Sequence, residues 1–271
     1  MLPHEDNVRT EISTKYRTQL DGMTQLHNAV VGMMTGGDWT VTKPDGTSPL
    51  VAETMIGLLV KASKTFRSVQ VLCERGLLED ASALVRMLLE TSVVVAFILQ
   101  KESILRARIY HTHISLQGRK TIDQWSREPV LAHVFSSEML QRADQALAEK
   151  LEDLPSGIDV KSIERHWSGM ANMREVMKAL GEEVAYLTFY KYGSLIAHGG
   201  DFGGHLEIDE ASGNRLWALA PTSDGFEHPS YAAREILWNT ASCIDTRLGL
   251  GFASTLAPHK LSPADVTKGK Q

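Results

Sequence analysis

An arginine and a glutamate in one apolar stretch have the spacing of an ion pair. Between residues 81 and 100, Arg86 and Glu90 are the only charged residues. Side chains four positions apart share one face of a helix, and a helix that is apolar on nearly all sides is buried, so we expect the pair to be largely removed from water. Two interpretations stay open. The pair is a structural salt bridge that fixes the helix register, or Arg86 holds an anionic ligand in an internal cleft.

A second group of polar side chains leads along the sequence to a histidine. Tyr186, Tyr190, Ser194 and His198 follow one another at intervals of four, so a continuous helix places them on one stripe. A histidine acts as a general acid or base near neutral pH. The candidate catalytic residues are therefore His198, Tyr190, Arg86 and Glu90, with Ser194 as a ligand-binding residue. The alternative is a core face whose hydroxyl groups are satisfied.

Basic side chains gather between residues 101 and 120, where the sequence has five basic residues and one glutamate. Arg106 precedes His111 by five positions, and Arg108 precedes His113 by the same interval. An arginine that holds a phosphate and a histidine that handles the 2′-hydroxyl proton would suit RNA cleavage. Arg106 and Arg108 are thus candidate ligand-binding residues, and the alternative is a solvated basic face.

Trp167 is a further candidate ligand-binding residue, since its ring offers a stacking surface. The alternative is a core anchor whose indole N–H finds a partner.

The glycine-rich segment after His198 does not match a known binding loop. Four glycines lie between residues 199 and 204, but the segment follows a helix and lacks the lysine of a phosphate-binding loop. His198, Asp201 and His205 have no second pair of ligands at a diagnostic spacing. We therefore expect no metal and no cofactor.

Proline placement predicts the elements that position these residues. The nine prolines leave residues 50–128, 156–220 and 230–257 free of proline, which costs about 3 kcal/mol in a helix interior. Apolar spacing, caps and glycine stops predict helices over about residues 8–34, 49–75, 79–100, 103–125, 137–151, 161–180, 182–197 and 230–256. The second and third of these should form a central antiparallel hairpin of helices.

The expected fold class is all-α, a multi-helix bundle of seven or eight helices. Alternating apolar and polar residues predict a small β-hairpin at about residues 205–219, inserted before the last helix. We expect one helical domain over residues 1–257 and a flexible tail over residues 258–271.

Composition limits the classes of function. The chain has 271 residues, 43% hydrophobic and 23% charged, and a net charge of −5, which disfavours a protein that coats nucleic acid or anionic membrane. The longest apolar run, residues 93–99, is far shorter than the roughly 20 residues of a membrane span. Cys73 and Cys243 have no partner at a metal-ligand spacing and indicate reduced thiols. We expect a soluble cytoplasmic protein without a signal peptide, a membrane contact or a strong sign of DNA binding.

Three sets of residues resemble an uncharacterised bacterial all-helical family, the domain of unknown function 5677. They are the turn at residues 76–81 that leads into residues 84–90, the Trp167-Ser168-Gly169 segment, and the stretch from Tyr190 to His198-Gly199. The resemblance covers roughly residues 50–200. It implies a helical cytosolic domain in which Arg86, Glu90, Tyr190 and His198 are the characteristic polar positions, and it implies no settled activity.

A weaker likeness is to HEPN-type helical domains, which often dimerise and include RNases. Their arginine and histidine element belongs on a late helix, whereas here the matching pairs lie on the fourth expected helix and Lys191 precedes His198. Two functional hypotheses result. The first is a polar cleft of Arg86, Glu90, Tyr190 and His198 that binds or processes an anionic small molecule or RNA. The second is a non-catalytic helical module that forms a homodimer or binds a partner.

Overall fold

The structure is a computed structural model that describes residues 5–37, 39, 48–199, 206–208, 212–213, 215–217 and 220–262. The chain divides into two compact units. The first unit contains Met1–Trp39, Met55–Ala96 and Glu183–Gln271, and the second contains Thr40–Thr54 and Phe97–Glu182. The division falls within two long helices, α3 (Pro49–Glu74) and α4 (Leu78–Gln100).

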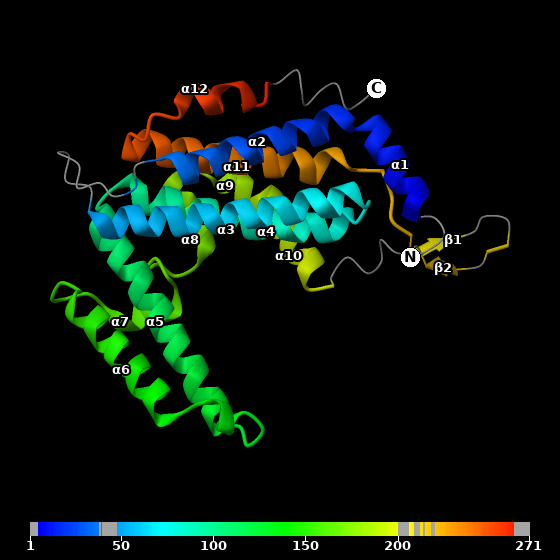
Figure 1. Cartoon of the computed structure of the whole chain (residues 1–271). Coiled ribbons are helices and arrows are strands. Elements are labelled where there is room, and N and C mark those ends of the chain that lie inside the picture. Colours follow the sequence, from blue (N-terminus) through cyan, green and yellow to red (C-terminus); the bar gives the residue numbers. More distant parts are fainter. Residues whose placement is uncertain are drawn as a thin grey trace. The chain divides into compact units, whose positions relative to one another are not determined.

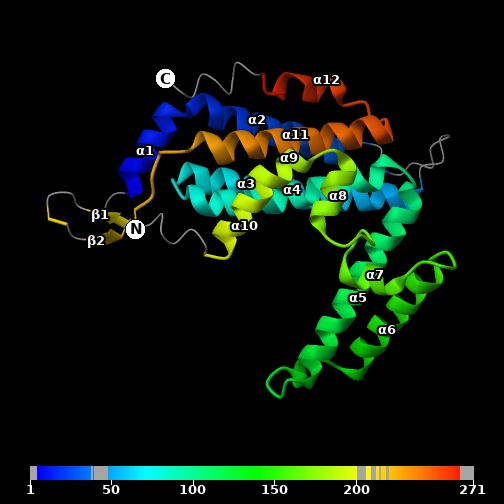
Figure 2. The same ribbon diagram turned by 180° about the vertical axis from the view of Figure 1, so that it is seen from behind.

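The first unit is built mainly of long helices. Its other helices are α1 (Glu5–Lys15), α2 (Arg17–Gly36), α9 (Glu183–Ala185), α10 (Lys191–Ala197), α11 (Glu227–Leu248) and α12 (Ala253–Leu256), with a π-helical segment η2 (Tyr186–Tyr190) between α9 and α10. In both views α2 lies beside α11, and α3 lies beside α4 (Figure 1, Figure 2). The apolar faces of these helices supply fully buried side chains such as Met23, Leu26, Leu59, Phe66, Leu88 and Phe226.

The turn between α3 and α4 requires a glycine. Gly76 has a φ of +74°, and a Cβ atom there would lie 2.8 Å from the Thr222 carbonyl oxygen and 2.8 Å from a methyl carbon of Val8. The Gly76 carbonyl accepts a hydrogen bond of 3.1 Å from the Thr222 N–H. Left-handed backbone and lack of space both favour glycine at this position, so the predicted helix stop coincides with a tertiary contact.

The second unit is centred on α5 (Ser103–Arg127), which lies beside α6 (Ser137–Glu152) (Figure 1). A short 3₁₀ turn, η1 (Ala132–Val134), precedes α6, and α7 (Val160–Arg165) and α8 (Met173–Leu180) follow it. Side chains cap these helices as their types predict: Ser136 accepts from the Met139 N–H at 3.2 Å, and Asn172 accepts from the Glu175 N–H at 3.1 Å.

The all-α prediction is confirmed, but the predicted count of seven or eight helices is too low. The expected helix at 8–34 is broken at Tyr16, whose ring stacks on Phe226 at 4.2 Å between centroids. The expected helix at 161–180 is interrupted between His166 and Asn172, where Gly169 has a φ of +71°. Breaks stabilised by tertiary packing or by one glycine leave the apolar spacing unchanged, so the sequence pattern does not reveal them.

Two short strands accompany the helices. In the segment where a hairpin was expected, β1 (Leu206–Ile208) pairs antiparallel with β2 (Arg215–Trp217), with Glu207 opposite Leu216. This three-residue ladder is the whole sheet within the described residues. At the C-terminal side a 3₁₀ turn, η4 (Ala257–His259), follows α12, and residues 263–271 of the expected tail lie outside the described residues.

In the described part of the chain, α4 alone is long and apolar enough to cross a membrane by length and composition. Its most apolar window has a mean hydropathy of 1.9 and is 61% buried inside the protein. Core helices of soluble proteins share these properties, so the helix is weak evidence for a membrane.

Candidate functional site

The structure brings Arg86, Glu90 and Tyr190 together in the first unit. Arg86 Nε lies 3.1 Å from Glu90 Oε1, and Arg86 Nη2 lies 3.5 Å from the Tyr190 hydroxyl. The guanidinium also lies over the Tyr190 ring, 4.8 Å from its centroid. The Arg86 and Glu90 side chains are 20% and 32% exposed, so the pair is less buried than expected, and its charges already compensate each other.

Close packing of α10 on α4 holds this group in place. A Cβ atom at Gly193 would lie 2.7 Å from Arg86 Cβ and 3.1 Å from the Ser82 carbonyl oxygen. The absence of a side chain at Gly193 therefore allows α10 to lie directly against the backbone of α4 and the stem of Arg86.

The π-helical segment η2 alters the predicted stripe. The Lys191 N–H donates to the Tyr186 carbonyl, five residues back, and Tyr186 stacks on Tyr190 with centroids 5.0 Å apart. A π turn holds more residues than an α turn, so side chains before and after it do not continue at intervals of four on one face. The prediction of a single stripe through Ser194 and His198 assumed a regular α-helix.

His198 lies at the end of α10 and is exposed. Its N–H donates to the Ser194 carbonyl at 3.2 Å, while its imidazole makes no hydrogen bond or ion pair with any described residue. Asp201 and His205, considered as its metal partners, lie outside the described residues. In the described ranges no group of three His, Cys, Asp or Glu residues is placed to hold a metal.

A different arginine lies in a hollow of the second unit. Arg106 is 9% exposed, and its Nη1 donates to the Phe97 carbonyl oxygen and to Gln100 Oε1, the latter at 3.3 Å. Its guanidinium carbon lies 3.8 Å from the centroid of the Phe97 ring. Arg106 forms no ion pair with a described carboxylate, and burial lowers its pKa, which the charge of Glu102 partly offsets.

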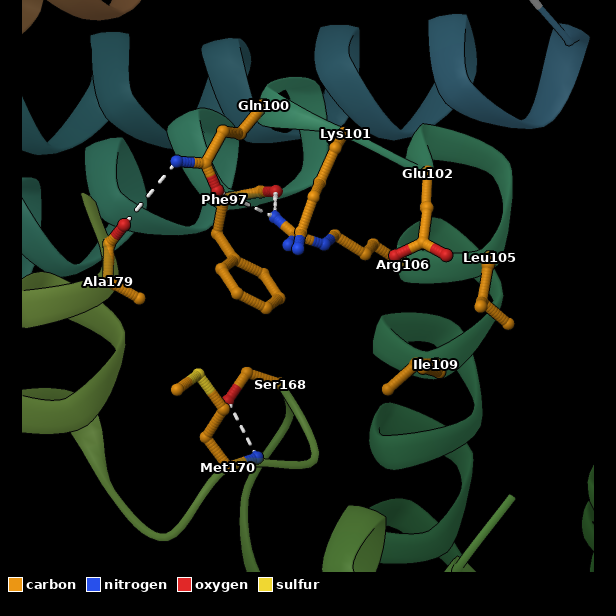
Figure 3. A pocket seen from close by; sticks show the side chains of 10 residues that line it. All are labelled: Phe97, Gln100, Lys101, Glu102, Leu105, Arg106, Ile109, Ser168, Met170 and Ala179. Carbon is orange, nitrogen blue, oxygen red and sulfur yellow. Dashed lines mark hydrogen bonds between the residues drawn. The ribbon is translucent and has the colours of Figure 1, made fainter. Parts of the chain in front are cut away.

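The hollow has a volume of about 600 Å³. Figure 3 shows Phe97 and Arg106 on one side of it and Ser168 with Met170 on the other. Its apolar wall comes from Phe97, Leu105, Ile109 and Met170. Trp167 packs behind this wall, edge-on to Phe97 with centroids 5.6 Å apart. Of the predicted ligand-binding residues, Arg106 thus lines the hollow, whereas Trp167 contacts the lining residue Phe97.

The rim of this hollow contains strained backbone. Glu102, which precedes the first turn of α5, has a φ of +49° and is the one non-glycine residue with positive φ among the described residues. Such strain costs free energy and tends to occur at functional sites. Glu102, Lys101 and Ser168 line the hollow together with Arg106.

Carboxylates pair with the basic residues in the second half of α5. Arg119 contacts Asp144 and lies 3.6 Å from Asp123, and Lys120 lies 3.8 Å from Glu164. Arg108 donates to the Asp153 carbonyl at 3.1 Å. The carboxylates thus compensate Arg119 and Lys120, whereas the described partner of Arg108 carries no charge.

The two predicted arginine and histidine pairs do not converge. His111 lies 2.9 Å from the Thr54 hydroxyl, whereas Arg106 bonds to Phe97. His113 Nδ1 lies 2.6 Å from the Ile163 carbonyl oxygen. Residues five apart on an α-helix point about 140° away from each other, which explains the divergence.

Comparison with known families matches the family of unknown function DUF5677 to residues 52–214. The chain belongs to this family. No curated protein and no solved structure matches the chain. The part that matches DUF5677 includes both arginine sites and the Trp167-Ser168-Gly169 segment, while the likeness to HEPN domains stays a prediction.

Sequence reasoning missed the other polar groups of the hollow within this DUF5677 region. Ser168 is buried, and its Oγ lies 2.7 Å from His166 Nδ1. Burial lowers the pKa of His166, and the nearby His113 lowers it further. The Trp167-Ser168-Gly169 segment contains this serine, but the sequence pattern singled out only its tryptophan as a candidate.

Proposed function

We propose that the protein binds a small organic anion in the hollow of the second unit, with Arg106 as the residue that holds the negative charge. The observation that carries the proposal is a buried guanidinium without a carboxylate partner among the described residues, at the wall of a hollow. Burying a charge is costly unless another group compensates it, and a bound anion would supply that compensation.

The charges around the hollow favour an anion. Lys101 and Arg106 are cationic and Glu102 is anionic, which leaves one excess positive charge. Arg106 Nη1 is engaged by Phe97 and Gln100, but its Nε and Nη2 make no hydrogen bond to a described residue. A guanidinium with free donors suits a carboxylate or a phosphate.

The wall of the hollow favours a ligand with an apolar portion. Phe97, Leu105, Ile109 and Met170 line it, and its volume of about 600 Å³ is in the range of small-molecule sites. An aryl or short alkyl group could pack there while the anionic group faces Arg106.

The Arg86 and Tyr190 group is a weaker binding site for the same ligand. Arg86 already has Glu90 at 3.1 Å and the Tyr190 ring beneath it, so an incoming anion would have to displace a carboxylate. RNA binding is also less favoured than a small anion, because acidic partners neutralise Arg119 and Lys120.

The test uses phenyl phosphate and benzoate as probes. Calorimetry measures their binding, and thermal unfolding measures the melting temperature in their presence. A ligand that binds only the folded state raises the melting temperature with concentration. We expect binding of at least one probe to the natural sequence, no binding to Arg106→Met, and weakened binding to Arg106→Lys, which keeps the charge but loses the planar fork.

Two variants serve as controls. Arg142→Met removes an exposed arginine that pairs with Glu138 at 2.6 Å and should bind like the natural sequence, as should His198→Gln. Equal binding by Arg106→Met, or no binding of either probe at millimolar concentration, would overturn the proposal. Loss of binding in His198→Gln alone would favour a site at Arg86 and Tyr190, and tighter binding of a short RNA would favour RNA.

A second candidate function, self-association, is favoured by apolar side chains on α9, η2 and α10. Val184, Leu187 and Leu195 are 75%, 53% and 49% exposed, and exposed apolar patches commonly mark interaction surfaces. We propose a homodimer through this surface. Light scattering after size exclusion should give a dimer for the natural sequence and a monomer for Leu187→Glu with Leu195→Glu, whereas Met139→Glu on α6 should stay dimeric. A monomeric natural sequence would contradict this proposal.

A further inference from the structure

We infer that Ser168 and His166 form a nucleophile and general-base pair at this hollow, suited to the hydrolysis of carboxylic esters. Both residues lie in the loop between α7 and α8, and Ser168 lines the hollow opposite Phe97 and Arg106 (Figure 3). A serine hydroxyl within hydrogen-bond reach of an imidazole is the arrangement from which acyl-transfer chemistry starts.

Hydrogen bonding fixes the direction of proton transfer. His166 Nδ1 lies 2.7 Å from Ser168 Oγ, and the Ser168 N–H donates to the same Nδ1 at 3.4 Å. A backbone N–H can only donate, so Nδ1 presents its lone pair and the imidazole proton is on Nε2. The Ser168 hydroxyl therefore donates to Nδ1, as a nucleophile donates to its base.

The surroundings keep this base neutral and the serine in position. Burial of His166 and the charge of His113 both lower the pKa of the His166 imidazole, so it is unprotonated at neutral pH. The Met170 N–H donates to Ser168 Oγ at 3.1 Å, which holds the hydroxyl in place and stabilises negative charge that develops on Oγ. Trp167 packs against the His166 ring with centroids 5.0 Å apart.

The reaction balances without a further reactant except water. Ser168 Oγ attacks the ester carbonyl carbon, and its proton passes to His166 Nδ1. The bond between this carbon and the alcohol oxygen breaks, and His166 returns the proton to the departing alcohol. Water then attacks the acylated serine, again giving one proton to His166. The bond between Oγ and the acyl carbon breaks as His166 returns this proton to Oγ, which releases a carboxylic acid and restores the serine hydroxyl and the neutral imidazole.

The substrate class rests on the proposed function, whereas the nucleophile does not. An ester that carries a separate carboxylate or phosphate would place that group at Arg106 and its apolar part against Leu105, Ile109 and Met170. The chemistry at Ser168 needs only His166, so the two proposals are separable by experiment.

The first measurement labels the full chain with diisopropyl fluorophosphate, a neutral reagent that phosphorylates activated serines and releases fluoride. Mass spectrometry of the intact protein and of its peptides locates the adduct. We expect one adduct, on Ser168, and none in protein unfolded with urea. His166→Gln should label at least about 100-fold more slowly, the scale of a lost general base. Ser126→Ala, which removes a hydroxyl that bonds to the Asp123 carbonyl, should label like the natural sequence.

The second measurement compares hydrolysis of 4-acetoxybenzoate with that of neutral phenyl acetate. The natural sequence should prefer the anionic ester, and Arg106→Met should lose this preference while still labelling at Ser168. If Ser168 of the natural sequence is labelled but the anionic ester is not preferred, the inference about the nucleophile stands. The proposal that the hollow binds an anion is then wrong. Absence of an adduct on Ser168 in the natural sequence, or equal labelling of folded His166→Gln, would overturn the inference whether or not phenyl phosphate binds.

Discussion

Two arginines with opposite surroundings define the chemistry at the scale of single residues. Arg86 is half-buried and is paired with Glu90 on its own helix. Arg106 is buried and bonds to a carbonyl and an amide oxygen, neither of which carries a charge. The first arrangement stabilises without a ligand, whereas the second leaves a positive charge that a ligand can use.

The pairing of Arg86 with Glu90 predicts that a single substitution lowers the stability more than a double substitution. Arg86→Met should lower the free energy of unfolding more than Arg86→Met combined with Glu90→Leu, because the single change leaves a carboxylate unpaired. The partial exposure of both side chains should keep the cost of the single change below the roughly 3–5 kcal/mol of a fully buried pair. Urea unfolding of the single variants and the double variant measures this coupling. An equal loss in Arg86→Met and in the double variant would show that the pair is solvated.

The sequence predicted the contacts of Arg86 only in part, for a physical reason. The Arg86 and Glu90 pair is set by helix geometry alone, so spacing was sufficient. The contact with Tyr190 depends on the packing of α10 against α4. The position of His198 depends on the π-helical segment η2, which no local sequence pattern predicted. The hollow at Arg106 joins residues from three separate segments, which a linear pattern cannot bring together.

At the scale of elements, the approach of α10 to α4 depends on Gly193. A methyl group there would lie 2.7 Å from Arg86 Cβ, and neither that atom nor the helix backbone can move away easily. Gly193→Ala should therefore destabilise the protein by about 1–3 kcal/mol, the usual cost of overpacking.

Gly57 on α3 provides the matched control for this substitution. A Cβ atom at Gly57 meets nothing within 4 Å, so Gly57→Ala should stabilise the protein by roughly 0.5–1 kcal/mol through helix propensity. The measurement is the free energy of urea unfolding of both variants. A neutral Gly193→Ala would show that α10 is less closely packed than described.

Helix positions were more predictable than helix continuity. Apolar spacing, caps, prolines and glycine stops predicted α3 to α6 within a few residues, because these signals act through the local sequence. The break at Tyr16 arises from stacking on Phe226, a residue more than two hundred positions away, and local spacing contains no information about it.

At the scale of the whole molecule, histidines whose pKa is lowered predict how stability depends on pH. Burial is the main cause that lowers the pKa of His27, His111, His166, His228 and His259. The unfolded chain, in which histidines have a pKa of about 6.5, then binds more protons than the folded chain. The contribution of these histidines to the free energy of unfolding is therefore fully present above about pH 6.5. It is lost as the pH falls below this value.

Urea unfolding between about pH 7.5 and pH 5.5 tests this dependence. We expect the free energy of unfolding to fall over this range, and His111→Gln, which can still bond to Thr54, should reduce the slope. His198→Gln changes an exposed side chain and should leave the slope as it is. A constant free energy of unfolding across the range would contradict the prediction.

The contacts at Gly76 have a consequence for the order of events during synthesis. Gly76 lies against Val8 near the beginning of the chain and against Thr222 near its end. At about 5–20 residues per second, a ribosome needs roughly 10–40 s to proceed from the first of these positions to the last. The apolar side chains of α1 and α2 therefore stay exposed on the nascent chain until α11 has been synthesised. A chain terminated before residue 222 would leave them accessible to chaperones and proteases.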